Sequence, residues 1–130
     1  MGALVDQHFQ AEARVDLDAI MATYASDVAF EMIGHPGGVL HDPAAIRVCY
    51  TRLFGEMTDL RRHTLRGWYG PNHLVDNSLI SARASGRPFG FEGKGRPFRF
   101  RLLHVFAFAE GRIARERGWL DLGAIMHQLA

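Results

Sequence analysis

The stretch RLLHVFAFAEGRIARERGWLD (residues 101–121) has the pattern of two β-strands joined by a turn at Glu110-Gly111. Side chains on a strand alternate between its two faces, so every second residue before this turn shares a face. Five of the six residues on that face are large and apolar, and one is a histidine: Phe98, Phe100, Leu102, His104, Phe106 and Phe108. Burying an imidazole without a partner costs free energy. Two interpretations of His104 follow: a core residue bonded to a backbone carbonyl, or a polar group in an apolar pocket.

The rest of the chain after residue 60 also alternates like strands, with turns at Gly70-Pro71 and between Gly86 and Gly95. Before residue 60 the apolar spacing is helical. It predicts helices near Leu4, after Asp16 and after Asp42-Pro43, with a short strand at 27–34 between the second and third. A fourth, short helix is predicted to begin at Asp121. The sequence therefore predicts one α+β domain over residues 1–130, with three N-terminal helices packed into a cone-shaped, curved antiparallel sheet of about four to six strands.

Composition excludes several classes of function. The chain has 130 residues, 48% of them apolar and 22% charged, as in ordinary globular proteins. A net charge of +1 gives no basic field for nucleic acid, and no apolar run is long enough to cross a membrane. No secretory signal is recognisable, so a cytoplasmic location is expected. The single cysteine, Cys49, cannot form an internal disulfide, and no metal or cofactor motif is present, so neither is expected.

Three stretches of the chain resemble the nuclear transport factor 2-like superfamily: DLDAIMATYASDVAFE (residues 16–31), HDPAAIRVCYTRLF (41–54) and FAFAEGRIARERGWLDLGAIMHQL (106–129). The third is similar to the end of the SnoaL-like branch. This resemblance implies a curved sheet around a pocket, as in polyketide cyclases, ketosteroid isomerases, scytalone dehydratases and limonene epoxide hydrolases. The same fold also serves non-catalytic binding and dimerisation domains, so it does not select an activity.

Residue-by-residue comparison with these relatives mainly argues against individual catalytic mechanisms. The general base of ketosteroid isomerase corresponds to Met32, and its two oxyanion-hole residues correspond to His8 and His104. A steroid isomerase without its base is disfavoured. Of the polar residues of limonene epoxide hydrolase only an arginine has a counterpart, Arg83, which disfavours that mechanism too. The catalytic histidine of scytalone dehydratase corresponds to His63. These matches imply that Arg83 and His63 point into the pocket; strand alternation alone leaves Arg62 and Thr64 as the inward alternative to His63.

Strand parity places further candidates inside the cone. Pairing the two strands in register across the turn puts Glu116 on the same face as His104, whereas the opposite parity would put Arg115 and Arg117 there. On the first helix His8 and Glu12 stand four residues apart, so they lie next to one another. The sequence therefore predicts acid/base residues His104, Glu116, His63 and Arg83, and substrate-binding residues His8, Glu12, Tyr24, Met32, Phe106 and Leu120. The alternatives are an ion pair of Glu116 with an arginine and a surface ion pair between His8 and Glu12. The other four histidines are predicted to be exposed: His35, His41, His73 and His127.

A histidine beside a carboxylate is typical of a general acid or base that works near neutral pH. The expected function is proton transfer on an apolar small molecule, in a cyclisation, isomerisation or dehydration. The alternative is a non-catalytic module of the same fold that binds a ligand or dimerises. The expected partners are an apolar ligand and a second copy of the chain. That copy is predicted to pack on the outer sheet face, through Trp68, Leu103, Val105 and Trp119.

Overall fold

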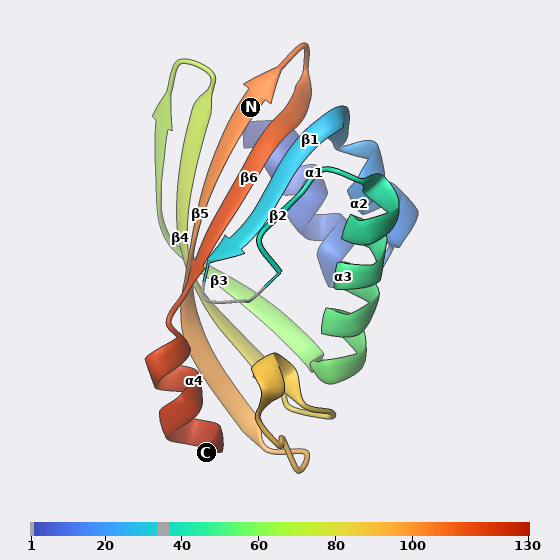
Figure 1. Ribbon diagram of the computed structural model, residues 1–130. Helices are drawn as coiled ribbons and strands as arrows, with labels where there is room; N and C mark the ends of the chain where they lie inside the picture. Colours follow the sequence, from blue (N-terminus) through green and yellow to red (C-terminus); the bar gives the residue numbers. More distant parts are fainter. Residues whose placement is uncertain (1, 34–36) are drawn as a thin grey trace.

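A computed structural model describes residues 2–33 and 37–130. The elements follow in the order α1 (Gly2–Ala13), α2 (Leu17–Ala22), β1 (Tyr24–Ile33), β2 (Val39–Leu40), α3 (Pro43–Glu56), β3 (Thr58–Gly70), β4 (His73–Arg83), the 3₁₀ turn η1 (Pro88–Gly90), β5 (Pro97–Ala109), β6 (Arg112–Leu120) and α4 (Leu122–Leu129) (Figure 1). The predicted division is confirmed, because α1, α2 and α3 all lie before residue 60 and only η1 interrupts the strands from there to residue 120; β1 and β2 lie between α2 and α3. His35, predicted to be exposed, lies outside the described residues.

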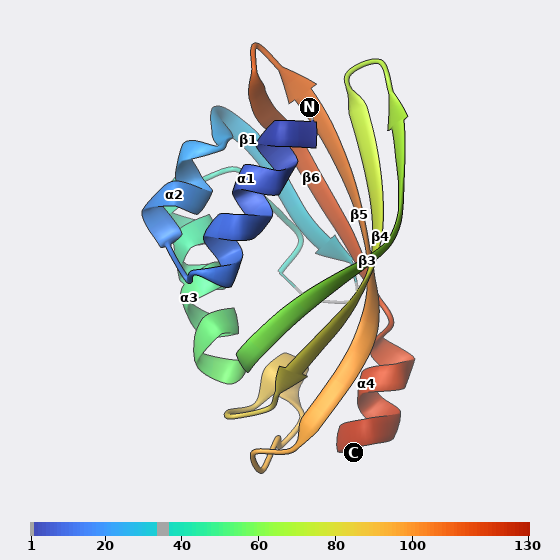
Figure 2. The same cartoon turned by 180° about the vertical axis from the view of Figure 1, so that it is seen from behind.

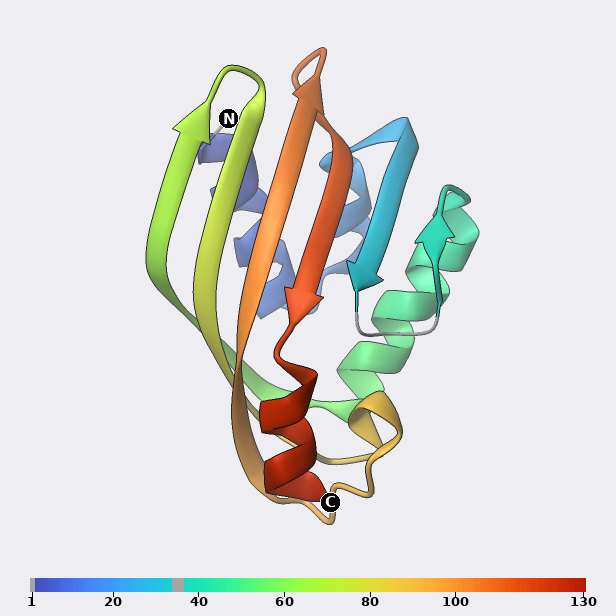
Figure 3. The ribbon, with the colours of Figure 1, turned by 60° about the vertical axis from the view of Figure 1, so that its left-hand side comes forward.

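Six strands form one sheet in the order β2-β1-β6-β5-β4-β3. Helices α1, α2 and α3 all cover the same face of this sheet (Figures 1 and 2), and Figure 3 looks onto the opposite, outer face. One strand pair departs from the antiparallel expectation, because β1 runs parallel to β6. These two strands are far apart in the chain, so no tight hairpin dictates their relative direction. The sheet is therefore mixed, with the helices and the inner sheet face enclosing the core.

The predicted helix starts are confirmed by their capping hydrogen bonds. A carboxylate oxygen of Asp16 accepts from the backbone N–H of Ala19, and Asp42 caps α3 in the same way, with Pro43 as the first helical residue. Asp121 caps α4 through the N–H of Ala124. Among the helices of the described residues, none is long and apolar enough to cross a membrane.

The β5–β6 hairpin has the predicted parity. His104 pairs with Gly118 and Phe106 pairs with Glu116, so these four residues share the inner face. Glu116 is buried, whereas Arg115 and Arg117 are exposed on the outer face. The apolar residues of the β5 face are buried as well, apart from the half-buried Phe108 at its end. The alternation therefore predicted correctly which carboxylate enters the core.

Helix α4 completes the sheet where a strand is missing. Strand β6 ends opposite Leu102, so the first part of β5 has no neighbour on that side. The side-chain amide of Gln128 takes the place of a strand: its oxygen accepts from the N–H of Arg99 and its nitrogen donates to the carbonyl of Arg99. Ile125 and Leu129 pack into the apolar cluster of this end of the molecule. The end of the cone is thereby closed.

Candidate active site

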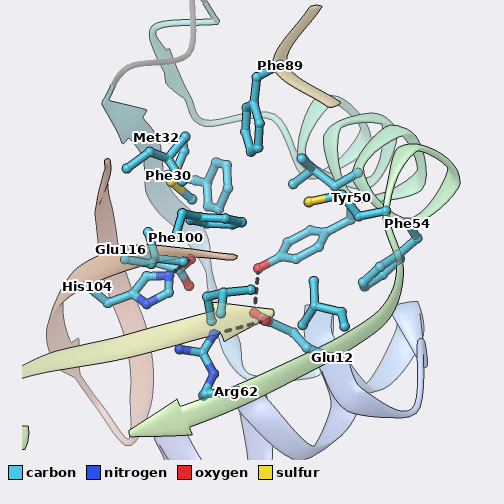
Figure 4. Close-up of a pocket in the computed structure, with 16 residues that line it drawn as sticks. Glu12, Phe30, Met32, Tyr50, Phe54, Arg62, Phe89, Phe100, His104 and Glu116 are labelled. Carbon is cyan, nitrogen blue, oxygen red and sulfur yellow. Dashed lines mark hydrogen bonds and ion pairs between the residues drawn. The ribbon is translucent and has the colours of Figure 1, made fainter. Parts of the chain in front are cut away.

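A partly open cavity of about 70 Å³ lies between the helices and the inner sheet face. Most of its walls are apolar, and its polar side chains are Glu12, Tyr50, Arg62, His104 and Glu116. Figure 4 shows Glu12 and Arg62 close together on one side of the cavity, with Phe89 on the opposite side. The polar groups thus come from different elements, α1, α3, β3, β5 and β6, and meet at one end of an apolar space.

His104 lies in the cavity wall beside two aromatic rings. Its ring stacks on Phe106 with 5.3 Å between centroids and lies 5.6 Å from that of Phe9. Its Nε2 is 3.8 Å from Oε2 of Glu116. Among the described residues, Nδ1 of His104 is the one buried side-chain polar atom without a hydrogen-bond partner. The interpretation of His104 as a core residue satisfied by a backbone carbonyl is therefore wrong.

The protonation state of His104 follows from its surroundings. Burial lowers the pKa of this imidazole below 6.5; Glu116 opposes the shift and the Arg62 guanidinium adds to it. The ring is therefore neutral at neutral pH and carries one proton. A bare lone pair facing the Glu116 carboxylate would be repelled, which assigns the proton to Nε2. Nδ1 then presents a lone pair that no described residue uses.

Glu116 is held on its other side by a network of hydroxyl and imidazole groups. Its Oε1 accepts a 2.9 Å hydrogen bond from the Tyr24 hydroxyl and lies 3.2 Å from Nε2 of His8. The Tyr24 and Tyr50 hydroxyls are 2.9 Å apart, and the Tyr50 hydroxyl also donates to Glu12 at 3.1 Å. The alternative in which Glu116 pairs with an arginine is therefore wrong.

Arg62 supplies the cationic edge of the cavity. Its guanidinium lies 3.6 Å from the centroid of the Phe9 ring, which fixes its plane by a cation–π contact. One terminal nitrogen is 3.5 Å from Oε2 of Glu12 and the other is 3.4 Å from Oδ2 of Asp76. The Ser78 hydroxyl donates to the same Asp76 oxygen at 2.6 Å. Both ion pairs are long, so the guanidinium keeps donor capacity for a ligand oxygen.

Comparison with known proteins identifies the family. The model of the SnoaL-like domain matches residues 5–116, which include all five polar residues of the cavity. The chain belongs to the SnoaL-like domain family. No curated protein sequence matches it.

Solved structures agree with this assignment at the level of the fold. An NTF2-like protein from Burkholderia thailandensis is 22% identical, with 96% of this chain and 93% of that one covered and a TM-score of 0.78. An LEH-like epoxide hydrolase from M. tuberculosis is 16% identical, with 98% and 86% covered and a TM-score of 0.75. A protein from Xanthomonas campestris, provisionally assigned as a polyketide cyclase, is 19% identical, with 99% and 96% covered and a TM-score of 0.83. Identities this low show the fold alone.

The SnoaL-like cavity brings together most of the predicted site residues. His104, Glu116, Glu12, Met32 and Leu120 line it. The other three predicted neighbours, His8, Tyr24 and Phe106, are buried in the layer directly behind the wall and do not line it. The predicted contact between His8 and Glu12 is confirmed at 2.8 Å, but it lies inside the protein and not on its surface. His41, His73 and His127 are exposed, as predicted.

Two predicted orientations are wrong. His63 is exposed on the outer face, and its neighbour Arg62 points inward. Register shifts in β3 on both sides of this segment change which residues face the core. Arg83 is also exposed, because Ala82 takes the inward position at the end of β4; its guanidinium donates to the carbonyl of Gly95 at 2.7 Å. The last correspondence with limonene epoxide hydrolase therefore lies outside the cavity.

Three polar residues of the SnoaL-like site were missed by the sequence analysis. Tyr50 lies on the apolar face of α3 and was assigned to the core, although its hydroxyl needs a buried partner. Asp76 pairs with His104 across β4 and β5, and the alternation of that strand places it on the inner face. Arg62 was considered only as the alternative to His63 for the inward position on its strand and was not included among the site residues. Among the described residues, no group of His, Cys, Asp or Glu side chains is arranged to hold a metal ion.

Proposed function

We propose that this SnoaL-like domain is an enzyme that transfers a proton on a small, mostly apolar molecule bound in the cavity. The observation that carries the proposal is the unpartnered Nδ1 of His104, on a ring that lines an apolar cavity beside a buried carboxylate. An unsatisfied buried nitrogen costs about 1–3 kcal/mol, which a structural histidine would avoid. A general base, by contrast, needs a free lone pair in the absence of substrate.

The proposed chemistry is enolisation of a carbonyl compound. The His104 imidazole takes a proton from the carbon next to the carbonyl group, and the Glu116 carboxylate stabilises the imidazolium that forms. Arg62 lines the same cavity and supplies donors for the oxygen that gains negative charge. Return of the proton to another carbon is isomerisation, attack of the enolate on a second carbonyl is cyclisation, and loss of a hydroxyl as water is dehydration. Each route balances without an oxidant or a group donor.

Hydrogen–deuterium exchange of simple ketones tests this function without knowledge of the natural substrate. Cyclopentanone, cyclohexanone and β-tetralone are incubated in D₂O with the wild-type protein, and loss of the α-proton signals is followed by NMR. We expect exchange of at least one ketone to exceed that with Glu116→Gln by about tenfold or more. His63→Gln, which changes an exposed histidine, is the matched control and should exchange like the wild type. A ketone that binds the cavity but exchanges equally with all three proteins would instead support a non-catalytic ligand-binding module.

We also propose that the protein is a homodimer formed through the outer sheet face. Trp68 and Trp119 are 44% and 36% exposed there, and the half-buried Leu103 and Val105 lie between them on β5. An exposed apolar patch of this kind favours a protein partner. We expect light scattering at micromolar concentration to give twice the chain mass of 14.6 kDa, and the Trp68→Arg, Trp119→Arg double variant to give a single chain. A wild-type particle with the mass of one chain would contradict the proposal.

A further inference from the structure

His8 is fully buried behind the cavity wall, and it takes no part in the proton transfer proposed above. It lies on α1, and its two ring nitrogens contact three different elements. Nδ1 is 2.8 Å from the hydroxyl oxygen of Thr23, and Nε2 is 2.8 Å from Oε1 of Glu12 and 3.2 Å from Oε1 of Glu116. The positions of the protons on this ring can be assigned by counting donors.

Nδ1 must carry a proton. The Thr23 hydroxyl has one hydrogen, and it is donated to the backbone carbonyl of Ile20 at 2.7 Å, because a carbonyl oxygen only accepts. The Thr23 oxygen is therefore left as an acceptor toward His8. The 2.8 Å contact is a hydrogen bond only if the imidazole nitrogen donates.

Nε2 must carry a proton as well. It faces oxygens of two carboxylates, and a bare lone pair at 2.8 Å from the Glu12 oxygen would be repelled. Burial lowers the pKa of His8, but the Glu116 and Glu12 carboxylates outweigh burial and raise this pKa from 6.5 to about 10. Burial likewise raises the pKa of Glu12, yet His8 and Arg62 outweigh it and lower this pKa to about 2. The charged pair therefore persists throughout the neutral range.

In this arrangement the two carboxylate oxygens of Glu116 have different partners. Oε1 receives both buried donors, Nε2–H of His8 and the Tyr24 hydroxyl. Oε2 is left to face His104, at the cavity wall. We propose that His8 is a charged positioning residue, an imidazolium that fixes which oxygen of Glu116 faces His104. The role of His8 in catalysis rests on the proposed function, but the charge state of its ring does not.

The groups around His8 come from every element packed on this end of the core. They are Glu12 on the same helix, Tyr24 on β1, Tyr50 on α3, Glu116 on β6, His104 on β5, and Arg62 on β3. Only the two carboxylates are anionic and in direct contact with the His8 ring. The positive charge of His8 lowers the pKa of His104, so removing that charge would raise this pKa and leave Arg62 as the remaining cation of the cluster.

Nitrogen NMR of the ¹⁵N-labelled wild-type protein tests the charge state directly. We expect both ring nitrogens of His8 to show protonated-type shifts from about pH 5 to about pH 9, whereas His104 shows one protonated and one bare nitrogen near neutral pH. Thr23→Val replaces the acceptor of Nδ1 with an apolar group of similar shape and should lower the pKa at which His8 titrates. A neutral His8 ring at neutral pH would overturn the inference.

The pH dependence of ketone exchange tests the positioning role. In His8→Gln, which keeps a neutral N–H donor, we expect the acidic limb of the exchange profile to move up by at least one pH unit, because the His8 charge that lowers the pKa of His104 is then absent. His127→Gln, an exposed histidine, is the control and should leave the limb in place. An unmoved limb would refute the role, since a purely structural histidine changes the rate but not the profile. The NMR measurement and the exchange measurement can also disagree. If His8 is an imidazolium but the wild-type protein exchanges no ketone, the assigned charge state stands and the proposed function is refuted. If His8→Gln does not fold, the pH profile of ketone exchange is measured with Thr23→Val instead. We expect its acidic limb to move in the same direction by a smaller amount.

Discussion

Replacing His104 by phenylalanine is expected to remove ketone exchange while the fold persists. The substitution deletes the lone pair that accepts the proton, and the loss of a general base typically lowers the rate by about 10²–10⁴-fold. The new ring stays beside Phe9 and Phe106, where an aromatic ring already packs. It also removes the unpartnered Nδ1, so the free energy of unfolding should be unchanged or rise by about 1 kcal/mol. Exchange rate and urea denaturation measure the two effects.

The matched control is His63→Phe, which changes an exposed histidine on the outer face and should leave exchange intact. An unfolded His104→Phe protein would show that the imidazole holds the core together. A folded His104→Phe protein with undiminished exchange would remove His104 from the active site. The combination of lost exchange with retained stability is what separates a catalytic histidine from a structural one.

Neutralising both carboxylates that contact His8 is expected to cost the protein much of its stability. The Glu12→Gln, Glu116→Gln double variant deprives His8 of its two anionic partners. Breaking a buried ion pair by removing one side typically costs about 3–5 kcal/mol. That is a large part of the roughly 5–15 kcal/mol by which domains are stable. Urea denaturation of the variant at neutral pH measures the loss.

The pH dependence of this loss has a defined sign. The pKa of His8 is raised in the folded state from 6.5 to about 10, so its stabilising contribution is complete below pH 6.5 and disappears as the pH rises through about 10. The difference between wild type and double variant should therefore shrink at alkaline pH. Asp18→Asn breaks the exposed 2.8 Å pair with Arg47 and is the control, with an expected change below about 1 kcal/mol. A double variant as stable as the wild type would contradict the charged cluster.

The residues of β5 and β6 show how far the sequence predicts this site. Strand β5 keeps an unbroken alternation from Phe98 to Phe106, so one apolar face identified His104 as the exception on it. A register shift between Ala107 and Phe108 then places Glu116, and not Arg115, opposite Phe106. The alternation of β5 was sufficient to identify His104, whereas the position of Glu116 also depends on this irregularity.

Where the site depends on irregular or distant pairing, the sequence was a poorer guide. Strand β3 carries register shifts that its polar residues do not signal, and so His63 was predicted inside in place of Arg62. Tyr50 reaches Tyr24 from 26 residues away, a contact that no local pattern contains. The parallel pairing of β1 with β6 is equally non-local. Such features arise from tertiary packing, which overrides the period of a single strand.

The most direct test of the account is to compare the pH dependence of ketone exchange with the titration of His104 in the same protein. The exchange rate in D₂O and the ring ¹⁵N shifts of His104 are measured across the same pH range, under identical solvent conditions. Burial lowers the pKa of this imidazole, so we predict that the acidic limb of the rate profile lies below 6.5 and coincides with the titration of the His104 ring. A rate that falls at a pH where the His104 shifts do not change would contradict the assignment of His104, with Glu116, as the proton-transferring pair.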